Sequence, residues 1–124
     1  MITRRLLALA HKGVARAECD ADGRWAVEQV LSGQDVRCLE VDPLNRQVVY
    51  AGTQGQGMFR SEDGGRSWRP AGLQGVIVKS LAASRHQPGV VYAGTKSPPL
   101  IYSTVVFCHS GISVLPYHAE TQSA

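Results

Sequence analysis

The chain has 124 residues, of which 44% are hydrophobic and 19% charged, and its formal net charge is +3. This size suits one small domain and excludes several separate cores. Basic and acidic residues are interspersed, without the basic stripe or tail of a nucleic-acid binder, so we expect no nucleic-acid partner.

The N-terminus begins with two arginines and a short apolar run, which is how a signal peptide opens. The run at residues 6–10 is shorter than the roughly 7–15 apolar residues of a secretory segment, so we expect a strand and no membrane span. Cys19, Cys38 and Cys108 are odd in number and widely spaced. Reduced thiols and a cytoplasmic location are the simpler interpretation.

Short apolar runs separated by turn residues predict strands throughout the chain, because thirteen glycines and six prolines favour turns over long helices. The runs fall into a partial unit at 6–31, a full unit at 36–72 and a partial unit at 77–103. The expected strands are residues 6–10, 14–17 and 25–30, then 36–41, 48–52, 58–61 and 67–69, and finally 77–83, 90–94 and 100–102.

An internal repeat relates the last two units. At an offset of 42 residues, the sequence Val-Val-Tyr-Ala-Gly-Thr at 48–53 recurs unchanged at 90–95, and residues 58–61 fall on 100–103. A period of about 40–45 residues is typical of the four-stranded blades of a β-propeller.

Residues 61–68 read Ser-Glu-Asp-Gly-Gly-Arg-Ser-Trp, or S-x-D-x-G-x-S-W, between two expected strands. This pattern resembles the Asp box of the BNR-repeat propellers, which include sialidases, sortilin-type receptors, xyloglucan-degrading hydrolases and photosystem II assembly factors. The resemblance covers residues 6–103. It implies an all-β fold, a partial β-propeller of four-stranded antiparallel blades with about 2–2.5 blades.

The role expected for the box is structural. Asp63 accepts hydrogen bonds from backbone N–H groups of its own turn, Ser61 adds a hydroxyl bond, and Gly65 tolerates an unusual backbone shape. Trp68 offers an apolar face for packing. We therefore assign Ser61, Asp63, Gly65, Ser67 and Trp68 as a structural Asp box, with no catalytic, cofactor or metal residue.

Catalytic alternatives have weaker support. A sialidase-like site needs an arginine cluster and a tyrosine nucleophile; Arg37 is present, but Tyr50 and Tyr92 recur at one repeat position, as packing residues do. A glycosidase pair needs carboxylates about 5–10 Å apart, and no convincing pair emerges from Asp35, Glu40, Asp42 and Asp63.

Metal binding is also not expected. Cys108-His109 and His118 lack the close ligand pairs of a zinc site. His11 and His86 lie in expected loops, where solvated histidines are the simpler interpretation.

The tail at residues 105–124 departs from the repeat. At the offset of 42, residues 105–107 should form an acidic glycine turn, but they read Val-Val-Phe. We expect an irregular, divergent tail, from a shifted frame, a premature end or a divergent terminus. Apolar runs at 105–108 and 112–115 could supply a substitute strand, with disorder from Pro116.

The sequence therefore predicts a non-catalytic BNR/Asp-box repeat module, a fragment of a propeller with a binding or scaffold role. Its partner is an unknown protein or carbohydrate, and open blade edges favour self-association. The alternative is a fragment of a sialidase- or xyloglucanase-like glycoside hydrolase whose catalytic residues lie outside this chain.

Overall fold

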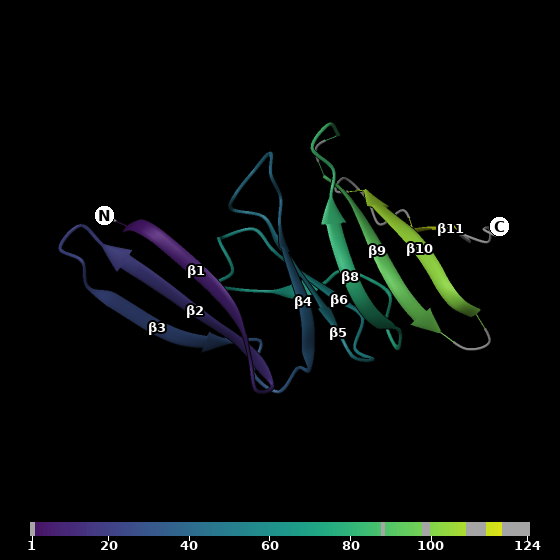
Figure 1. Cartoon of the computed structure of the whole chain (residues 1–124), viewed down its shortest axis with the longest axis horizontal. Coiled ribbons are helices and arrows are strands. Elements are labelled where there is room, and N and C mark those ends of the chain that lie inside the picture. The colour runs from purple at the N-terminus through teal and green to yellow at the C-terminus, as the bar shows by residue number, and fades with distance from the viewer. Residues whose placement is uncertain (1, 88, 98–99, 109–113, 118–124) are drawn as a thin grey trace.

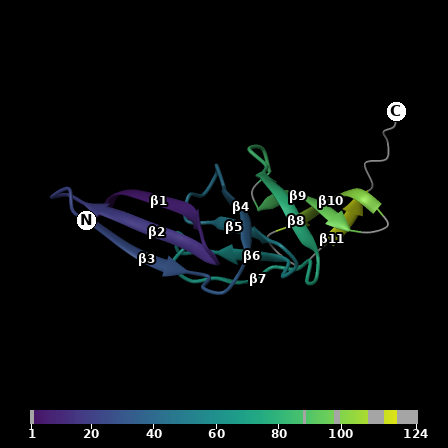
Figure 2. The same cartoon turned by 60° about the horizontal axis from the view of Figure 1, so that its bottom comes forward.

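The computed structural model describes residues 2–87, 89–97, 100–108 and 114–117, and the side chains of residues 4–87 and 89–96. The described residues form strands and no helix. The strands make three antiparallel sheets that stand in a row, with the sheet of β4–β7 between the other two (Figure 1). The turned view shows the same order (Figure 2). The all-β, antiparallel fold class is thus confirmed, and the described sheets do not close a ring.

The first sheet has the order β1-β2-β3. Its strands are β1 (Ile2–Ala10), β2 (Gly13–Asp20) and β3 (Trp25–Val30). All three expected strands are present, and the first two are longer than expected. A tight turn at Lys12 joins β1 to β2, and the turn at residues 20–24 joins β2 to β3.

The central sheet has the order β4-β5-β6-β7. Its strands are β4 (Val36–Val41), β5 (Val49–Thr53), β6 (Met58–Ser61) and β7 (Arg69–Pro70). Four strands are present as expected, although the last begins two residues later than the expected 67–69. Every residue of β5 is buried, because both faces of this strand are covered by neighbouring sheets.

The third sheet has the order β11-β10-β9-β8. Its strands are β8 (Ile77–Ala83), β9 (Val90–Ser97), β10 (Leu100–Cys108) and β11 (Val114–Tyr117). The expectation that apolar runs at 105–108 and 112–115 supply a substitute strand agrees with β10 and β11. The expectation of irregular structure was wrong for the described part of the tail, because β10 crosses the expected boundary at residue 104 and β11 includes Pro116 and Tyr117. Residues 109–113 and 118–124 lie outside the described residues.

The repeat of 42 residues holds for the first two strands of the central and third sheets. Both strand pairs have the same register and the same irregularity at their start. The matching pairs are Val36↔Thr53 with Val78↔Thr95, Cys38↔Gly52 with Ser80↔Gly94, and Glu40↔Tyr50 with Ala82↔Tyr92.

The offset changes to 46 residues for the last two strands. Phe59 pairs with Ala51 and Pro70, and Val105, which lies 46 residues after Phe59, pairs with Ala93 and Pro116. The expected match of residues 58–61 to 100–103 was therefore wrong. The chain between the paired residues Gly94 and Thr104 is four residues longer than the chain between the matching pair, Gly52 and Met58. The later strands of the third sheet are therefore shifted by four positions.

The core consists of two apolar layers between neighbouring sheets. The layer between the first and central sheets is built from Val14, Val30, Val36 and Ala51, with Leu7, Leu31, Leu39, Phe59 and Trp68 packed against it. The layer between the central and third sheets is built from Val48, Tyr50, Met58 and Val91, with Ala71, Leu73 and Leu81 against it. The sheets thus associate by burying apolar side chains face to face.

Candidate functional site

The Asp-box turn connects β6 to β7 and is closed by hydrogen bonds among its own residues. Ser61 is the last residue of β6, and the chain then reverses through Gly64 and Gly65 at φ values of 76° and 90°. Only glycine adopts such values without strain. This explains why the motif carries glycine at its centre.

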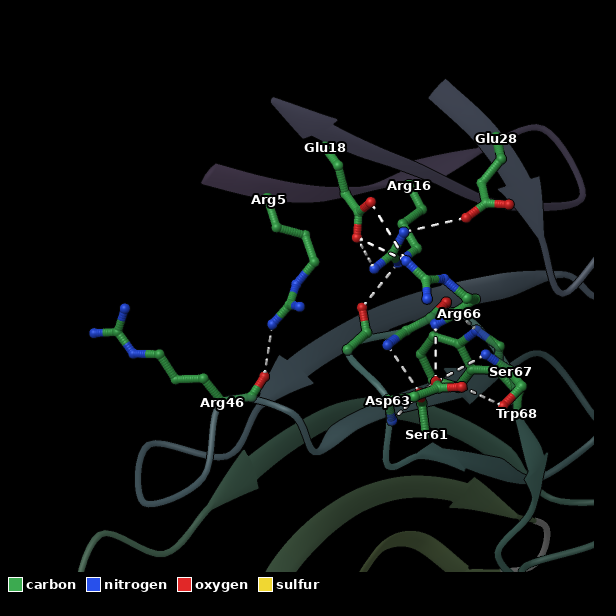
Figure 3. A network of polar contacts seen from close by, with 12 residues as sticks. Arg5, Arg16, Glu18, Glu28, Arg46, Ser61, Asp63, Arg66, Ser67 and Trp68 are labelled. Atoms are coloured by element: carbon green, nitrogen blue, oxygen red, sulfur yellow. Dashed lines mark hydrogen bonds and ion pairs between the residues drawn. The ribbon is translucent and has the colours of Figure 1, made fainter. Parts of the chain in front are cut away.

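The Asp63 carboxylate is bonded within its own turn (Figure 3). Its Oδ1 atom accepts hydrogen bonds from the backbone N–H of Arg66 at 3.1 Å, the backbone N–H of Ser67 at 2.9 Å and the Ser61 hydroxyl at 2.8 Å. Its Oδ2 atom accepts the Ser67 hydroxyl at 2.6 Å. Both oxygens are therefore used to close the loop.

Ser61 and Trp68 complete the turn. The Ser61 hydroxyl oxygen accepts the backbone N–H of Gly65 at 2.8 Å, and the Trp68 indole N–H donates to the Gly65 carbonyl at 2.8 Å. The half-buried Trp68 ring packs against the apolar layer between the first and central sheets. Each of the five residues assigned from the sequence thus contributes a bond, a backbone shape or a packing surface to one loop.

These bonds set the charge of the site. Partial burial raises the pKa of the Asp63 carboxyl, but hydrogen bonds from Ser67, Ser61 and Arg66 lower it by more, and the pKa lies well below its ordinary value. Asp63 is therefore a stable anion at neutral pH. Such a group is a poor proton donor or acceptor for acid–base chemistry at that pH.

A buried arginine docks the box onto the first sheet (Figure 3). Arg16, in the middle of β2, is 2% exposed, and its Nε–H donates to the Gly64 carbonyl at 3.0 Å. Its terminal nitrogens form ion pairs with Glu18 and with Glu28, the latter at 3.1 Å. Glu18 also pairs with Arg66 of the box at 3.2 Å. The box is consequently tied to its neighbour sheet by charge as well as by packing.

Sequence reasoning missed this network. An arginine inside a strand reads as a solvated residue, and its burial depends on a sheet that is 48 residues away in the sequence. The available signal was the arrangement of Arg16, Glu18 and Glu28, which the register of β2 and β3 places near one another. The Arg16 hydrogen bond is the largest cause that lowers the pKa of the Glu18 carboxyl.

An open groove of about 320 Å³ lies at the box and is lined by Arg60, Glu62, Asp63, Ser67, Trp68 and Arg69. Glu62 forms ion pairs with Arg60 and, at 2.8 Å, with Arg69. The Arg60 guanidinium also lies 5.9 Å from the centre of the Tyr50 ring. The charges lining the groove are thus paired with one another.

The structure does not unite the residues weighed for catalysis. Tyr50 is 2% exposed inside the core, while Tyr92 is 40% exposed at the matching register position. Arg37 is exposed and paired with Asp35 at 3.1 Å. The other two acids have structural bonds: the Glu40 carboxylate accepts the Ala83 N–H at 3.3 Å, and buried Asp42 accepts the Leu44 N–H at 2.9 Å.

The structure also does not bring the histidines together as metal ligands among the residues that it describes. His11 and His86 are exposed in loops, as expected. His109 and His118 lie outside the described residues. Within the part of the chain that the structure describes, no group of three or more His, Cys, Asp or Glu side chains could hold a metal ion.

The turn at residues 20–24 of the first sheet resembles a degenerate copy of the box, and we call it the worn box. Asp20 Oδ1 accepts the backbone N–H groups of Asp22 and Arg24, each at 2.9 Å. Cys19, opposite Trp25 in the register, is as buried as Ser61. Trp25 follows a Gly-Arg step as Trp68 follows Gly-Arg-Ser, so Trp25 is the counterpart of Trp68.

In the third sheet the offset of 46 aligns the sequence of residues 107–114 with the box. Gly111 and Ser113 then match Gly65 and Ser67, while Phe107, His109 and Val114 replace Ser61, Asp63 and Trp68. The acidic residue is therefore missing from the motif itself, although the spacing of the repeat is kept.

No protein-family model and no curated protein sequence matches this chain. Among the described residues, no helix is long and apolar enough to cross a membrane.

Proposed function

We propose that this chain is a non-catalytic repeat module of the Asp-box propeller type, acting in binding or scaffolding. The observation that carries the proposal is the bonding of Asp63. Both of its carboxylate oxygens accept hydrogen bonds from Ser61, Arg66 and Ser67, so the most conspicuous acidic motif of the sequence is used to close a loop. A carboxylate so engaged stabilises its turn rather than a substrate.

The propeller part of the proposal is supported by the repetition of the sheets. The central and third sheets have four strands in the same order, and their first strand pairs have the same register and the same start irregularity. Neighbouring sheets bury apolar residues face to face, as successive blades do. In this proposal the first sheet is a blade whose described strands correspond to β5–β7.

The binding role rests on the chemistry of the surface. The groove at the box is lined by Trp68 and by paired charges from Arg60, Glu62 and Arg69. An aromatic ring beside paired polar groups suits a protein or carbohydrate partner better than a small apolar ligand. The proposed location of the protein is cytoplasmic.

Two assays on the purified chain test the proposal. We expect Asp63→Ala to lower the melting temperature, and we expect the parent not to hydrolyse a fluorogenic sialoside or xyloglucan oligosaccharides. Asp22→Ala, at an exposed position of the worn box, is the matched control for stability. Turnover of either glycoside that Asp63→Ala abolishes without a change in melting would contradict the proposal and favour a glycoside hydrolase.

A further inference from the structure

Each sheet of this chain has two different faces. The face of the central sheet that contains Ala51 and Phe59 packs against the first sheet, and we call faces of this kind front faces. The opposite face, with Tyr50 and Met58, packs against the third sheet, and we call it a back face. At both internal junctions, the back face of one sheet covers the front face of the next.

On β8 and β9, where the side chains of the third sheet are described, residues of the back face are open to solvent. Tyr92 has the register position of Tyr50, but its exposed fraction is 40% instead of 2%. Ala82, its partner on β8, is also exposed. A tyrosine that is buried at one junction is thus open to solvent at its repeat equivalent.

The two matching glycines show the same contrast. A β-carbon at Gly52 would lie 2.5 Å from Val78 Cγ1, so β8 of the third sheet approaches β5 closely enough to require glycine there. At Gly94 the nearest described atom to such a β-carbon is Ser80 Oγ, a residue of its own sheet. Gly94 therefore has the position of Gly52 in the repeat, but no described residue of another sheet lies against it.

Among the described residues, large side chains on the front face of the first sheet are exposed. The register aligns Leu6, Ala17 and Val27 in one row across the sheet, and Leu6 is 60% and Val27 69% exposed. In the next row Trp25, the counterpart of Trp68, is 45% exposed, and the Arg4 guanidinium lies 5.8 Å from its ring centre. This row of large apolar side chains has the composition of a packing surface rather than of a solvated face.

We propose that the two open faces bind each other between copies of this chain, so that the back face of the third sheet in one copy covers the front face of the first sheet in a second copy. This inference rests on the repeat relation in the proposed function, and it names the partner as a second copy. The two internal junctions already show that faces of these two kinds fit. A head-to-tail contact of this kind leads to a ring or to an open chain of copies.

The experiment is sedimentation velocity with light scattering on the full chain at about 100 µM, a concentration that detects micromolar association. The parent is expected to have at least twice the mass of one chain. Val27→Glu, on the open front face, and Tyr92→Glu, on the open back face, are each expected to weaken association by about tenfold or more. Leu44→Glu, at a position 48% exposed in the loop between β4 and β5, is the control and should associate like the parent.

Mixing the two variants tests the head-to-tail geometry. Val27→Glu keeps an intact back face and Tyr92→Glu an intact front face, so an equimolar mixture is expected to form a complex of two chains that neither variant forms alone. A mixture that stays monomeric would overturn the head-to-tail contact, as would a monomeric parent or a Val27→Glu variant that associates like the parent. Circular dichroism confirms that each variant is folded, and Ala82→Glu replaces Tyr92→Glu if the latter is not.

Failure of this inference is separable from failure of the proposed function. A monomeric parent whose melting temperature still falls on Asp63→Ala would remove self-association and leave the structural Asp box intact. An associating parent that is indifferent to Asp63→Ala would do the reverse.

Discussion

Replacing Asp63 with alanine removes the acceptor at the centre of the Asp-box turn. The carboxylate accepts hydrogen bonds from the Ser61 hydroxyl, two backbone N–H groups and the Ser67 hydroxyl. Alanine offers no acceptor to any of these donors. The loop then retains the Ser61 bond to Gly65 and the Trp68 bond to the Gly65 carbonyl.

The expected loss follows from the exposure of those donors. A typical hydrogen bond contributes a net ~0.5–1.5 kcal/mol to stability, and a donor left unpaired costs most where water cannot reach it. Arg66 and Ser67 are exposed, so water replaces part of what Asp63 gave them, whereas the buried Ser61 hydroxyl loses its acceptor and keeps only the bond that its oxygen accepts from Gly65. We therefore expect a loss of roughly 2 kcal/mol in the free energy of unfolding, which is the size of a strong cap removal.

Thermal unfolding by circular dichroism measures this loss. For a chain of this length, the melting temperature should fall by roughly 6–10 °C. Asp63→Asn should fall by less, because its amide oxygen still accepts the N–H groups, and Asp22→Ala should stay near the parent. An Asp63→Ala variant that melts within about 1 °C of the parent would refute the structural role derived from the turn geometry.

Three further outcomes are expected. The pKa of Asp63 is lower in the folded protein than in the unfolded chain, so the stability that its charge contributes is complete above about pH 4 and is lost as the pH falls further. The free energy of unfolding should therefore fall more steeply with acid in the parent than in Asp63→Asn, and equal slopes would contradict this. Arg16→Gln leaves the Glu18 carboxylate and the Gly64 carbonyl without their buried partner and should lower the free energy of unfolding in urea by roughly 2–4 kcal/mol. Arg24→Gln, at an exposed position, should lower it little, and equal urea midpoints for the two variants would count against the docking network. Gly52→Ala places a β-carbon 2.5 Å from Val78 Cγ1 and should cost about 1–3 kcal/mol, and a neutral result would show that the central and third sheets are not packed this closely.

The strand pattern could be predicted because it depends on local composition. Apolar runs bounded by glycine, proline and aspartate indicated the strands of the first and central sheets, and the recurrence of residues 48–53 at 90–95 indicated β9 of the third. In the tail, the apolar runs at 105–108 and 112–115 indicated a strand, but the place of these strands in the repeat could not be predicted in this way. The sequences around Val105 and Phe59 are not alike, so they do not reveal that these residues are equivalent. The equivalence of Pro116 and Pro70 can be recognised only when the longer hairpin is known.

The candidate site likewise has a part that could be predicted from local sequence and a part that could not. The Asp63 turn could be predicted because its bonds join residues within one loop, where the order of side chains determines the geometry. Burial of Arg16 could not, because it is decided by the packing of one sheet on another. The expectation that Tyr50 and Tyr92 are both packing residues is confirmed for Tyr50, which is 2% exposed, and is wrong for Tyr92, which is 40% exposed. The different exposures of Tyr50 and Tyr92, which have the same local sequence, show this dependence directly.

Amide hydrogen exchange at the Asp-box turn tests the central claim most directly. Arg66 and Ser67 are exposed loop residues, and their backbone N–H groups bond to Asp63 Oδ1 at 3.1 and 2.9 Å. The structure predicts slow exchange at both amides in the parent and fast exchange in Asp63→Ala, while the amides of Tyr50 and Ala51 in β5 stay protected in both. Exchange at Arg66 and Ser67 in the parent as fast as in an unstructured chain would contradict an Asp box that closes this loop.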